Sequence, residues 1–148
     1  MDIQPFREYD FYAILGQMIP SSLDAVRKLE PYITKATNAA TLRNKKGEIL
    51  MIGGVADMWQ GVGEAWALIS PQGLRSPVAL RKAADIFLMQ SKPNYWRIQA
   101  TVPADFGERV RWALSLGFSF DGNNRDPMRG YGPDGSDYYM MAIKGSRK

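Results

Sequence analysis

The spacing of hydrophobic residues predicts an alternation of short strands and amphipathic helices. From Tyr95 to Val102, hydrophobic and polar residues alternate, which is typical of a strand with one buried face. From Glu8 to Met18, hydrophobic residues recur every three or four positions, as in a helix packed on one side. Applied along the chain, these spacings predict strands at 2–6, 39–43, 48–58, 64–70, 95–102, 118–121 and 137–144, and helices at 8–18, 21–32, 78–90 and 104–116.

The order of these elements predicts a mixed α+β fold. The polar stretches 44–47 and 60–63 each join two neighbouring strands, so three antiparallel strands follow one another. Gly53 and Gly54 inside the middle strand predict a bulge or bend. The strand–helix–strand unit 64–102 should place its two strands parallel. Helices then cover the sheet, and a length of 148 residues suits one domain over 1–148.

Three finer expectations concern single residues and the end of the chain. We expect Gly117 to follow the end of the helix 104–116, because glycine accepts the left-handed conformation common there. The apolar stripe of that helix is expected at Phe106, Val110, Ala113 and Leu114. The residues 145–148 are expected to fray.

The stretch from 64 to 90 is the strongest candidate for a binding site. A strand is followed by a turn with two Pro and one Gly, and then by a helix for which Ser76 is the expected N-cap and Pro77 the first residue. Free amides and the positive end of the helix dipole suit an anion such as a phosphate. Arg75, Arg81 and Lys82 add positive charge nearby. The alternative is an ordinary strand–turn–helix unit without a ligand.

Composition excludes several kinds of chemistry. The chain has no Cys and no His, so thiol nucleophiles, thiolate metal sites and the Ser-His-Asp triad are absent. The carboxylates form no cluster with ligand spacing, so we predict no metal site. The net charge is +4 with scattered basic residues, which argues against nucleic-acid binding. We expect no membrane span and no signal peptide.

Two segments of the sequence resemble the GNAT (Gcn5-related N-acetyltransferase) superfamily. The first is the strand–turn–helix at 64–90, and the second is the helix that ends in Leu116-Gly117-Phe118. Trp66, Leu74-Arg75, Arg111-Trp112 and the Gly-rich loop from Met128 to Gly135 are similar to a phage subset of this superfamily, the internal virion proteins of short-tailed phages. The resemblance implies a GNAT-like acyl-CoA N-acyltransferase fold, with a mixed, mostly antiparallel sheet, one splayed parallel strand pair and helices on both faces.

The resemblance implies a CoA site at the strand–turn–helix. In GNAT enzymes the diphosphate of acetyl-CoA lies on amides of a Gln/Arg-x-x-Gly-x-Gly/Ala turn. Gln72 matches the first position, whereas Arg75 and Pro77 replace the two small residues. Arg75 either blocks the phosphate or pairs with it, and Pro77 removes one amide. The cofactor-binding residues implied in this way are Leu68, Ile69, Ser70, Gln72, Gly73, Leu74, Arg75 and Ser76.

The implied acid–base pair is incomplete. Glu64 lies where GNAT enzymes often keep a carboxylate base, although it could equally be a surface carboxylate at the end of a strand. Ala113 replaces the tyrosine that usually serves as general acid. Tyr131, Tyr138 and Tyr139 are possible substitutes or packing residues, and the last two point to opposite faces of a strand.

Two functional hypotheses follow from the resemblance. The first is a phage virion or assembly protein on a GNAT scaffold with a degenerate CoA motif, which binds other virion proteins and is found in the host cytoplasm or the virion. The alternative is an active acetyl-CoA-dependent N-acetyltransferase that acts on a small-molecule or protein amine.

Overall fold

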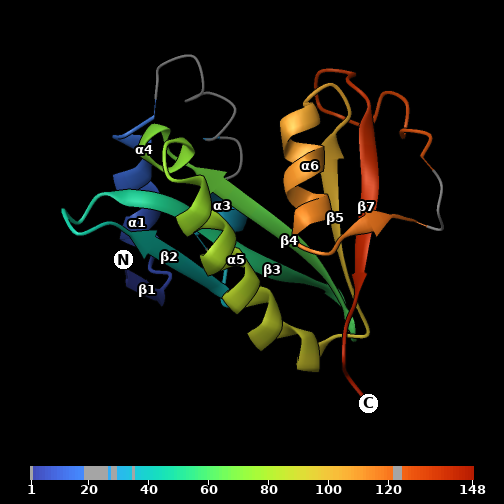
Figure 1. Ribbon diagram of the computed structural model, residues 1–148, viewed down its shortest axis with the longest axis horizontal. Helices are drawn as coiled ribbons and strands as arrows, with labels where there is room; N and C mark the ends of the chain where they lie inside the picture. Colours follow the sequence, from blue (N-terminus) through green and yellow to red (C-terminus); the bar gives the residue numbers. More distant parts are fainter. Residues whose placement is uncertain (1, 19–26, 28–29, 35, 122–124) are drawn as a thin grey trace. The chain divides into compact units, whose positions relative to one another are not determined.

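The computed structural model describes residues 2–18, 27, 30–34, 36–121 and 125–148 (Figure 1). Within them, the described strands form one sheet in the order β1-β2-β3-β4-β5-β7-β6. The strands are β1 (Asp2–Pro5), β2 (Ala39–Arg43), β3 (Ile49–Trp59), β4 (Val62–Ile69), β5 (Arg97–Pro103), β6 (Ser119–Phe120) and β7 (Tyr138–Lys144). The helices are α1 (Glu8–Leu15), α3 (Glu30–Ile33), α4 (Pro71–Leu74), α5 (Pro77–Ser91), the 3-10 helix η1 (Lys92–Asn94) and α6 (Gly107–Ser115).

The chain divides into two compact units, which share the strands β3 and β4 and the helix α5. The first unit comprises Met1–Ala56 and Trp66–Phe87, and the second comprises Asp57–Ala65 and Leu88–Lys148. We describe each unit by itself.

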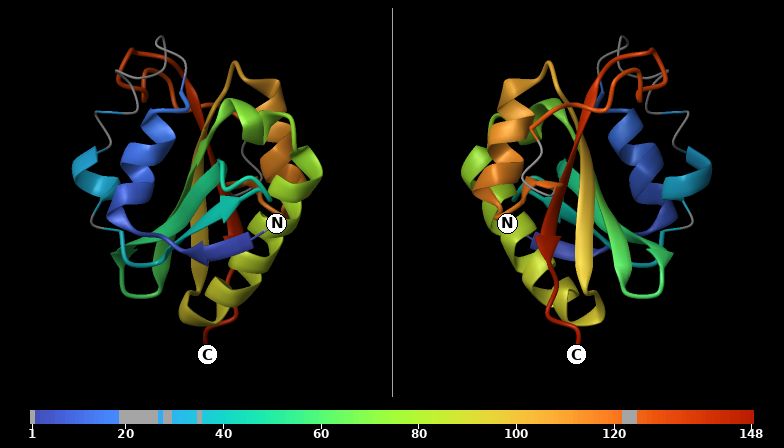
Figure 2. Two further views of the ribbon diagram at one scale, coloured as in Figure 1. Left: turned by 90° about the vertical axis from the view of Figure 1, so that its left-hand side faces the viewer. Right: turned by 90° about the vertical axis from the view of Figure 1, so that its right-hand side faces the viewer.

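In the first unit, helices cover both faces of the strands (Figure 2). On one face, α1 and α3 bury Phe11, Ile14 and Ile33 against Ile52 of β3 and Leu68 of β4. These side chains are at most 8% exposed. Their removal from water is the main force that holds the helices on the sheet.

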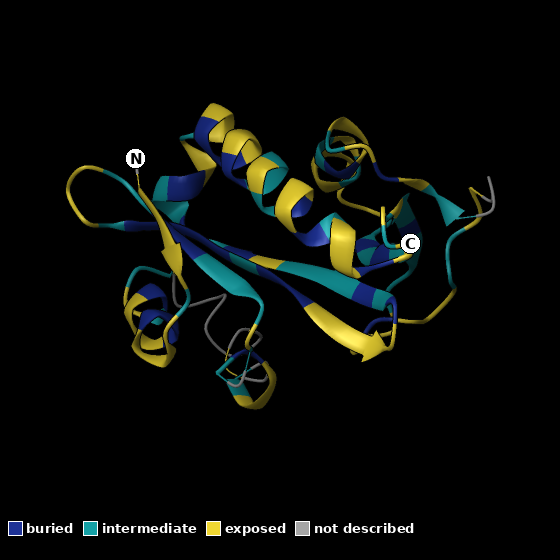
Figure 3. Cartoon of the chain, turned by 90° about the horizontal axis from the view of Figure 1, so that it is seen from below, coloured by how far each residue is buried: buried dark blue, intermediate teal, exposed yellow. Residues whose placement is uncertain are grey.

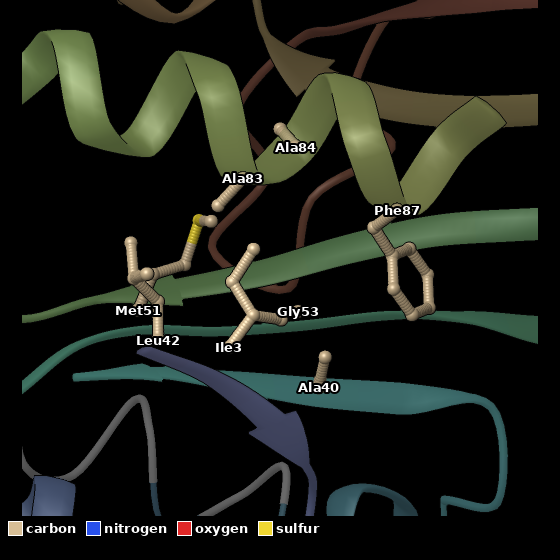
Figure 4. Close-up of a pocket in the computed structure, with 8 residues that line it drawn as sticks. All are labelled: Ile3, Ala40, Leu42, Met51, Gly53, Ala83, Ala84 and Phe87. Atoms are coloured by element: carbon tan, nitrogen blue, oxygen red, sulfur yellow. The ribbon is translucent and has the colours of Figure 1, made fainter. Parts of the chain in front are cut away.

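On the other face of the first unit, α5 packs through its buried side, which includes Ala79, Leu80 and Ala83 (Figure 3). A small cavity remains between this helix and the strands (Figure 4). Its lining is apolar and comes from Ile3, Ala40, Leu42, Met51 and Gly53 of the strands and from Ala83, Ala84 and Phe87 of α5.

A part-buried ion pair joins α1 to β2 in the first unit. The Asp10 carboxylate is 3% exposed and lies 2.7 Å from the Arg43 guanidinium of β2. It also accepts hydrogen bonds from the Thr41 hydroxyl and the Arg7 amide. All its partners are supplied by the protein, so this carboxylate is a structural group.

In the second unit, β5 is the central strand. It pairs antiparallel with β7 over seven residue pairs, from Arg97–Lys144 to Pro103–Tyr138. On its other edge it pairs parallel with β4, at Val62–Arg97, Gly63–Ile98 and Glu64–Gln99. The strand–helix–strand unit therefore has the parallel arrangement predicted from its sequence.

The structure corrects four sequence predictions. The turn 71–77 contains the helix α4. The irregularity between β2 and β3 lies at Leu42/Arg43 and not at Gly53 and Gly54. Phe106 and Leu114, predicted to be buried, are 53% and 44% exposed. The tail does not fray, because the amides of Gly145, Ser146 and Arg147 donate to the carbonyls of Trp96, Lys92 and Tyr95.

Other predictions of local structure are confirmed or lie outside the described residues. Gly117 follows α6 with a φ of 101°, as expected for a residue just past a helix end. Tyr138 and Tyr139 contact different rings, those of Tyr131 and Phe120. Most of the helix predicted at 21–32 lies outside the described residues.

Candidate functional site

Ser70 turns the chain out of the sheet at the start of the candidate site. It is fully buried, and its amide donates to the Leu50 carbonyl. Its hydroxyl donates to the Ile49 carbonyl at 2.6 Å and accepts the Gly73 amide at 3.1 Å, so Ser70 is the N-cap of α4. One side chain thus joins the first residues of β3 to the turn that follows β4.

Gly73 brings α4 into direct contact with β3. A Cβ atom at this position would lie 2.0 Å from the Leu50 carbonyl oxygen, so only glycine fits without a shift of the backbone. Gly73 therefore has a packing role in the turn.

Most amides of the turn already have acceptors in the protein. Besides the Gly73 amide, those of Leu74, Arg75 and Ser76 donate to the carbonyls of Ser70, Gln72 and Gly73. In a GNAT enzyme, the amides of this turn bind the diphosphate. Here the helical conformation of α4 gives these amides acceptors within the protein.

Open amides lie instead at the start of α5, which begins at Pro77 as predicted. The amides of Val78 and Ala79 have no acceptor among the described residues, because they belong to the first turn of the helix. The Gln72 amide, in the first turn of α4, is open in the same way. The Ser76 hydroxyl donates to the Gln72 carbonyl at 3.4 Å, so the predicted side-chain cap of α5 is absent.

The basic side chains near α5 differ in their pairing. Arg75 is exposed and forms no ion pair within the part of the chain that the structure describes. Arg81 lies 3.1 Å from Asp85 in an exposed pair one helical turn along. Arg75 has φ −86° and ψ −2°, a conformation open to any residue, so its place in the turn does not require glycine.

Of the other predicted cofactor residues, Leu74 is 69% exposed, whereas Gln72, Leu68 and Ile69 have structural side chains. Gln72 accepts a hydrogen bond from Gln17 at 3.2 Å and donates to Glu48 at 3.4 Å. Leu68 belongs to the hydrophobic core of the first unit. Ile69 is half-buried and lies beside the position of Gly73. These three side chains pack or form hydrogen bonds within the protein.

The candidate catalytic residue belongs to the second unit. Glu64 is half-buried and lies opposite Gln99 in the short parallel pairing of β4 with β5. The Gln99 side chain accepts from Arg97, which also lies 2.7 Å from Asp121. Ala113 of α6 is 6% exposed and has no group that could donate a proton.

Sequence reasoning missed the side chains of Gln17 and Glu48, which support the turn. Gln17 is 55 residues away from Gln72 along the chain, and neither Gln17 nor Glu48 belongs to a recognisable motif. Hydrogen-bonding side chains of this kind carry no local pattern.

The described residues contain no group of three or more side chains suited to a metal ion. No helix in that part of the chain has the length and hydrophobicity to span a bilayer.

Comparison with known proteins shows the fold. No family model matches the chain, and no curated protein matches it. Among solved structures, smu.2055 from Streptococcus mutans is similar over 97% of this chain and 99% of its own, with a TM-score of 0.71 and 16% identity.

Two further structures have named activities. A GNAT-family acetyltransferase from Streptococcus pneumoniae matches with a TM-score of 0.65 and 16% identity, over 98% of this chain and 99% of its own. A mutant of the spermidine N-acetyltransferase SpeG from Vibrio cholerae matches with a TM-score of 0.67 and 12% identity, over 97% of this chain and 95% of its own. Because all these identities are low, the likeness shows the fold alone. The chain has the mixed α+β architecture of the GNAT acyltransferase fold, as its sequence predicted.

Proposed function

We propose that the protein is an acyl-CoA-dependent N-acyltransferase whose diphosphate site is displaced from the α4 turn to the start of α5. The supporting observation is the pattern of open donors. The turn amides are engaged within the protein, whereas Val78, Ala79 and the Arg75 side chain have no protein partner among the described residues.

The chemistry of these donors suits a diphosphate. Two open amides at the positive end of a 15-residue helix favour an anion, and an exposed guanidinium can form charge-assisted hydrogen bonds to phosphate oxygens. This arrangement supports the second of the two roles considered for Arg75, namely that it pairs with the phosphate.

Under this proposal, the residues of the chain bind and orient the reactants. Bound acyl-CoA would supply a thioester, whose carbonyl carbon an amine nitrogen can attack directly. Glu64 would accept the proton that the amine loses. Backbone groups of Leu68 and Ile69 would orient the pantetheine arm. With Ala113 in place of a tyrosine, the thiolate leaves without a protein acid.

We propose a primary amine as the acyl acceptor. The support is the fold, which the chain shares with spermidine and other N-acetyltransferases. A panel of polyamines, amino sugars and lysine peptides, assayed for release of free CoA, would identify the acceptor class.

The first prediction concerns CoA binding and Arg75. Isothermal titration should show that CoA binds the wild type, and Arg75→Gln should weaken this binding about tenfold, since a hydrogen bond to a charged group contributes about 1.5–3 kcal/mol. Lys46→Gln, which removes the same charge from the β2–β3 hairpin, is the matched control and should bind as the wild type does.

Three outcomes would contradict this proposal in different ways. No heat of binding at millimolar CoA removes the acyltransferase function. Equal affinity of Arg75→Gln and wild type removes the role of Arg75. Tighter binding by Arg75→Gly shows that Arg75 blocks the phosphate.

The hypothesis of a phage virion role rests on the sequence resemblance alone. No described feature and no comparison adds support to it, so it stays a prediction.

A further inference from the structure

A chain of side-chain hydrogen bonds joins the α4 turn to α1 and to the β2–β3 hairpin. It consists of Gln17, just past the end of α1, then Gln72 of α4, Glu48 before β3, and Asn44 of the β2–β3 hairpin. Gln17 donates to Gln72, Gln72 donates to Glu48, and Asn44 donates to Glu48, at 3.2, 3.4 and 3.0 Å. We call these four residues the amide chain.

Gln17 anchors the amide chain to the sheet. The side-chain oxygen of Gln17 accepts a hydrogen bond from the Ile49 amide at 3.0 Å, and its side-chain nitrogen donates to the Ile49 carbonyl at 2.8 Å. Ile49 lies opposite Arg43 of β2, and the Gln17 side chain bonds both its amide and its carbonyl, as a neighbouring strand would. The second hydrogen of the same nitrogen reaches the Gln72 side chain, so both Nε2 hydrogens of Gln17 have acceptors.

The direction of the amide chain is fixed by chemistry. An ionised Glu48 only accepts hydrogen bonds, so the Gln72 nitrogen must face it and the Gln72 oxygen must face Gln17. A carboxylate at position 72 could accept from Gln17 but would have no proton to donate to Glu48.

We infer that Gln17, Gln72 and Glu48 are positioning residues, which hold α4 so that the open amides of α5 and Arg75 face the acyl-CoA diphosphate. This inference rests on the proposed function. Ser70 fixes the start of α4 through the Gly73 amide, and the amide chain fixes the side of α4 that carries Gln72. Arg75 and Ser76, which lead into α5, donate their amides to the carbonyls of Gln72 and Gly73, so their positions follow that of α4.

The test exchanges the donor and the acceptor. Gln72→Glu places two carboxylates together and breaks the chain, whereas Gln72→Glu combined with Glu48→Gln restores one donor and one acceptor in reverse order. Glu48→Gln alone is the partial disruption, because its single amide oxygen can replace only one of the two Glu48 oxygens that accept from Gln72 and Asn44. Each protein is measured by amide hydrogen exchange at Leu74 and Ser76, by titration with CoA, and by urea unfolding.

We expect Gln72→Glu to exchange the Leu74 and Ser76 amides at least about tenfold faster and to bind CoA about tenfold more weakly. The double variant should return both quantities to within about threefold of the wild type. Recovery of CoA affinity together with turn protection supports a positioning role. Recovery of unfolding stability without recovery of affinity overturns it, because a merely structural chain would behave in that way.

Two further outcomes separate this inference from the proposed function. Unchanged exchange at Leu74 and Ser76 in Gln72→Glu would show that the amide chain does not hold the turn, and would overturn the inference even if CoA binds. Failure of the wild type to bind CoA would overturn the proposed function and, with it, the positioning role.

Discussion

Gly73 shows how strongly one residue constrains the candidate site. Because a Cβ atom would lie 2.0 Å from a backbone oxygen, the neighbour that must move is the strand β3 itself. We predict that Gly73→Ala lowers the free energy of unfolding by about 1–3 kcal/mol, which is the usual cost of overpacking. Gly16→Ala is the control, since Gly16 has φ −65° and its nearest atom would be 3.4 Å away. Equal urea midpoints for the two variants would contradict the contact.

Single residues of the site could be located from the sequence, but their partners could not. Pro77 was correctly placed at the first position of a helix, because its fixed φ and missing amide suit that position. Gln72 was identified as a cofactor residue, yet its side chain is engaged by Gln17 and Glu48. Partners so distant in sequence meet only through the tertiary fold, which local patterns do not encode.

The end of the chain gives a prediction at the scale of elements. Three backbone hydrogen bonds join residues 145–147 to η1 and the residues just before β5, and the Arg147 guanidinium lies 4.7 Å from the centre of the Trp96 ring. Removal of residues 145–148 should therefore lower the free energy of unfolding by about 1–3 kcal/mol, after allowance for the entropy of the freed tail. Arg147→Ala, which keeps the backbone bonds, should lose no more than about 1 kcal/mol. A truncated chain with the urea midpoint of the full chain would show that the tail does not stabilise the fold.

Periodicity predicted the elements better than it predicted their irregularities. The strand 39–43 was predicted with its observed bounds, because the polar turn 44–47 marks its end. Gly53 and Gly54 were predicted to form a bulge or bend, but they pair in regular register with β2, and a Cβ on Gly54 would lie 2.6 Å from the Asn38 carbonyl. The small size of Gly54 allows close packing against the neighbouring strand. A glycine in a strand has both uses, and only the tertiary structure distinguishes them.

At the scale of the whole molecule, the order of elements was the most informative feature of the sequence. A strand, a helix and a second strand within 64–102 predicted the parallel pair, because the crossover needs that arrangement, and the pairing of Glu64 with Gln99 agrees. The conformation of the turn between them was not predictable, since a helical turn and an open anion-binding loop have similar Pro, Gly and Ser content.

The continuity of β3 and β4 leads to a prediction about folding. Each strand runs from one compact unit into the other, with the boundaries after Ala56 and Ala65. Because unfolding of either unit would break strands that the other needs, we expect one cooperative transition, as for a single domain. Variants that keep one tryptophan, with phenylalanine at the other three positions, can report each unit separately: Trp66 for the first and Trp112 for the second. Urea midpoints that coincide with each other and with far-UV circular dichroism would establish a single domain over 1–148. Midpoints that differ by more than the error of the fit would show two units that unfold independently.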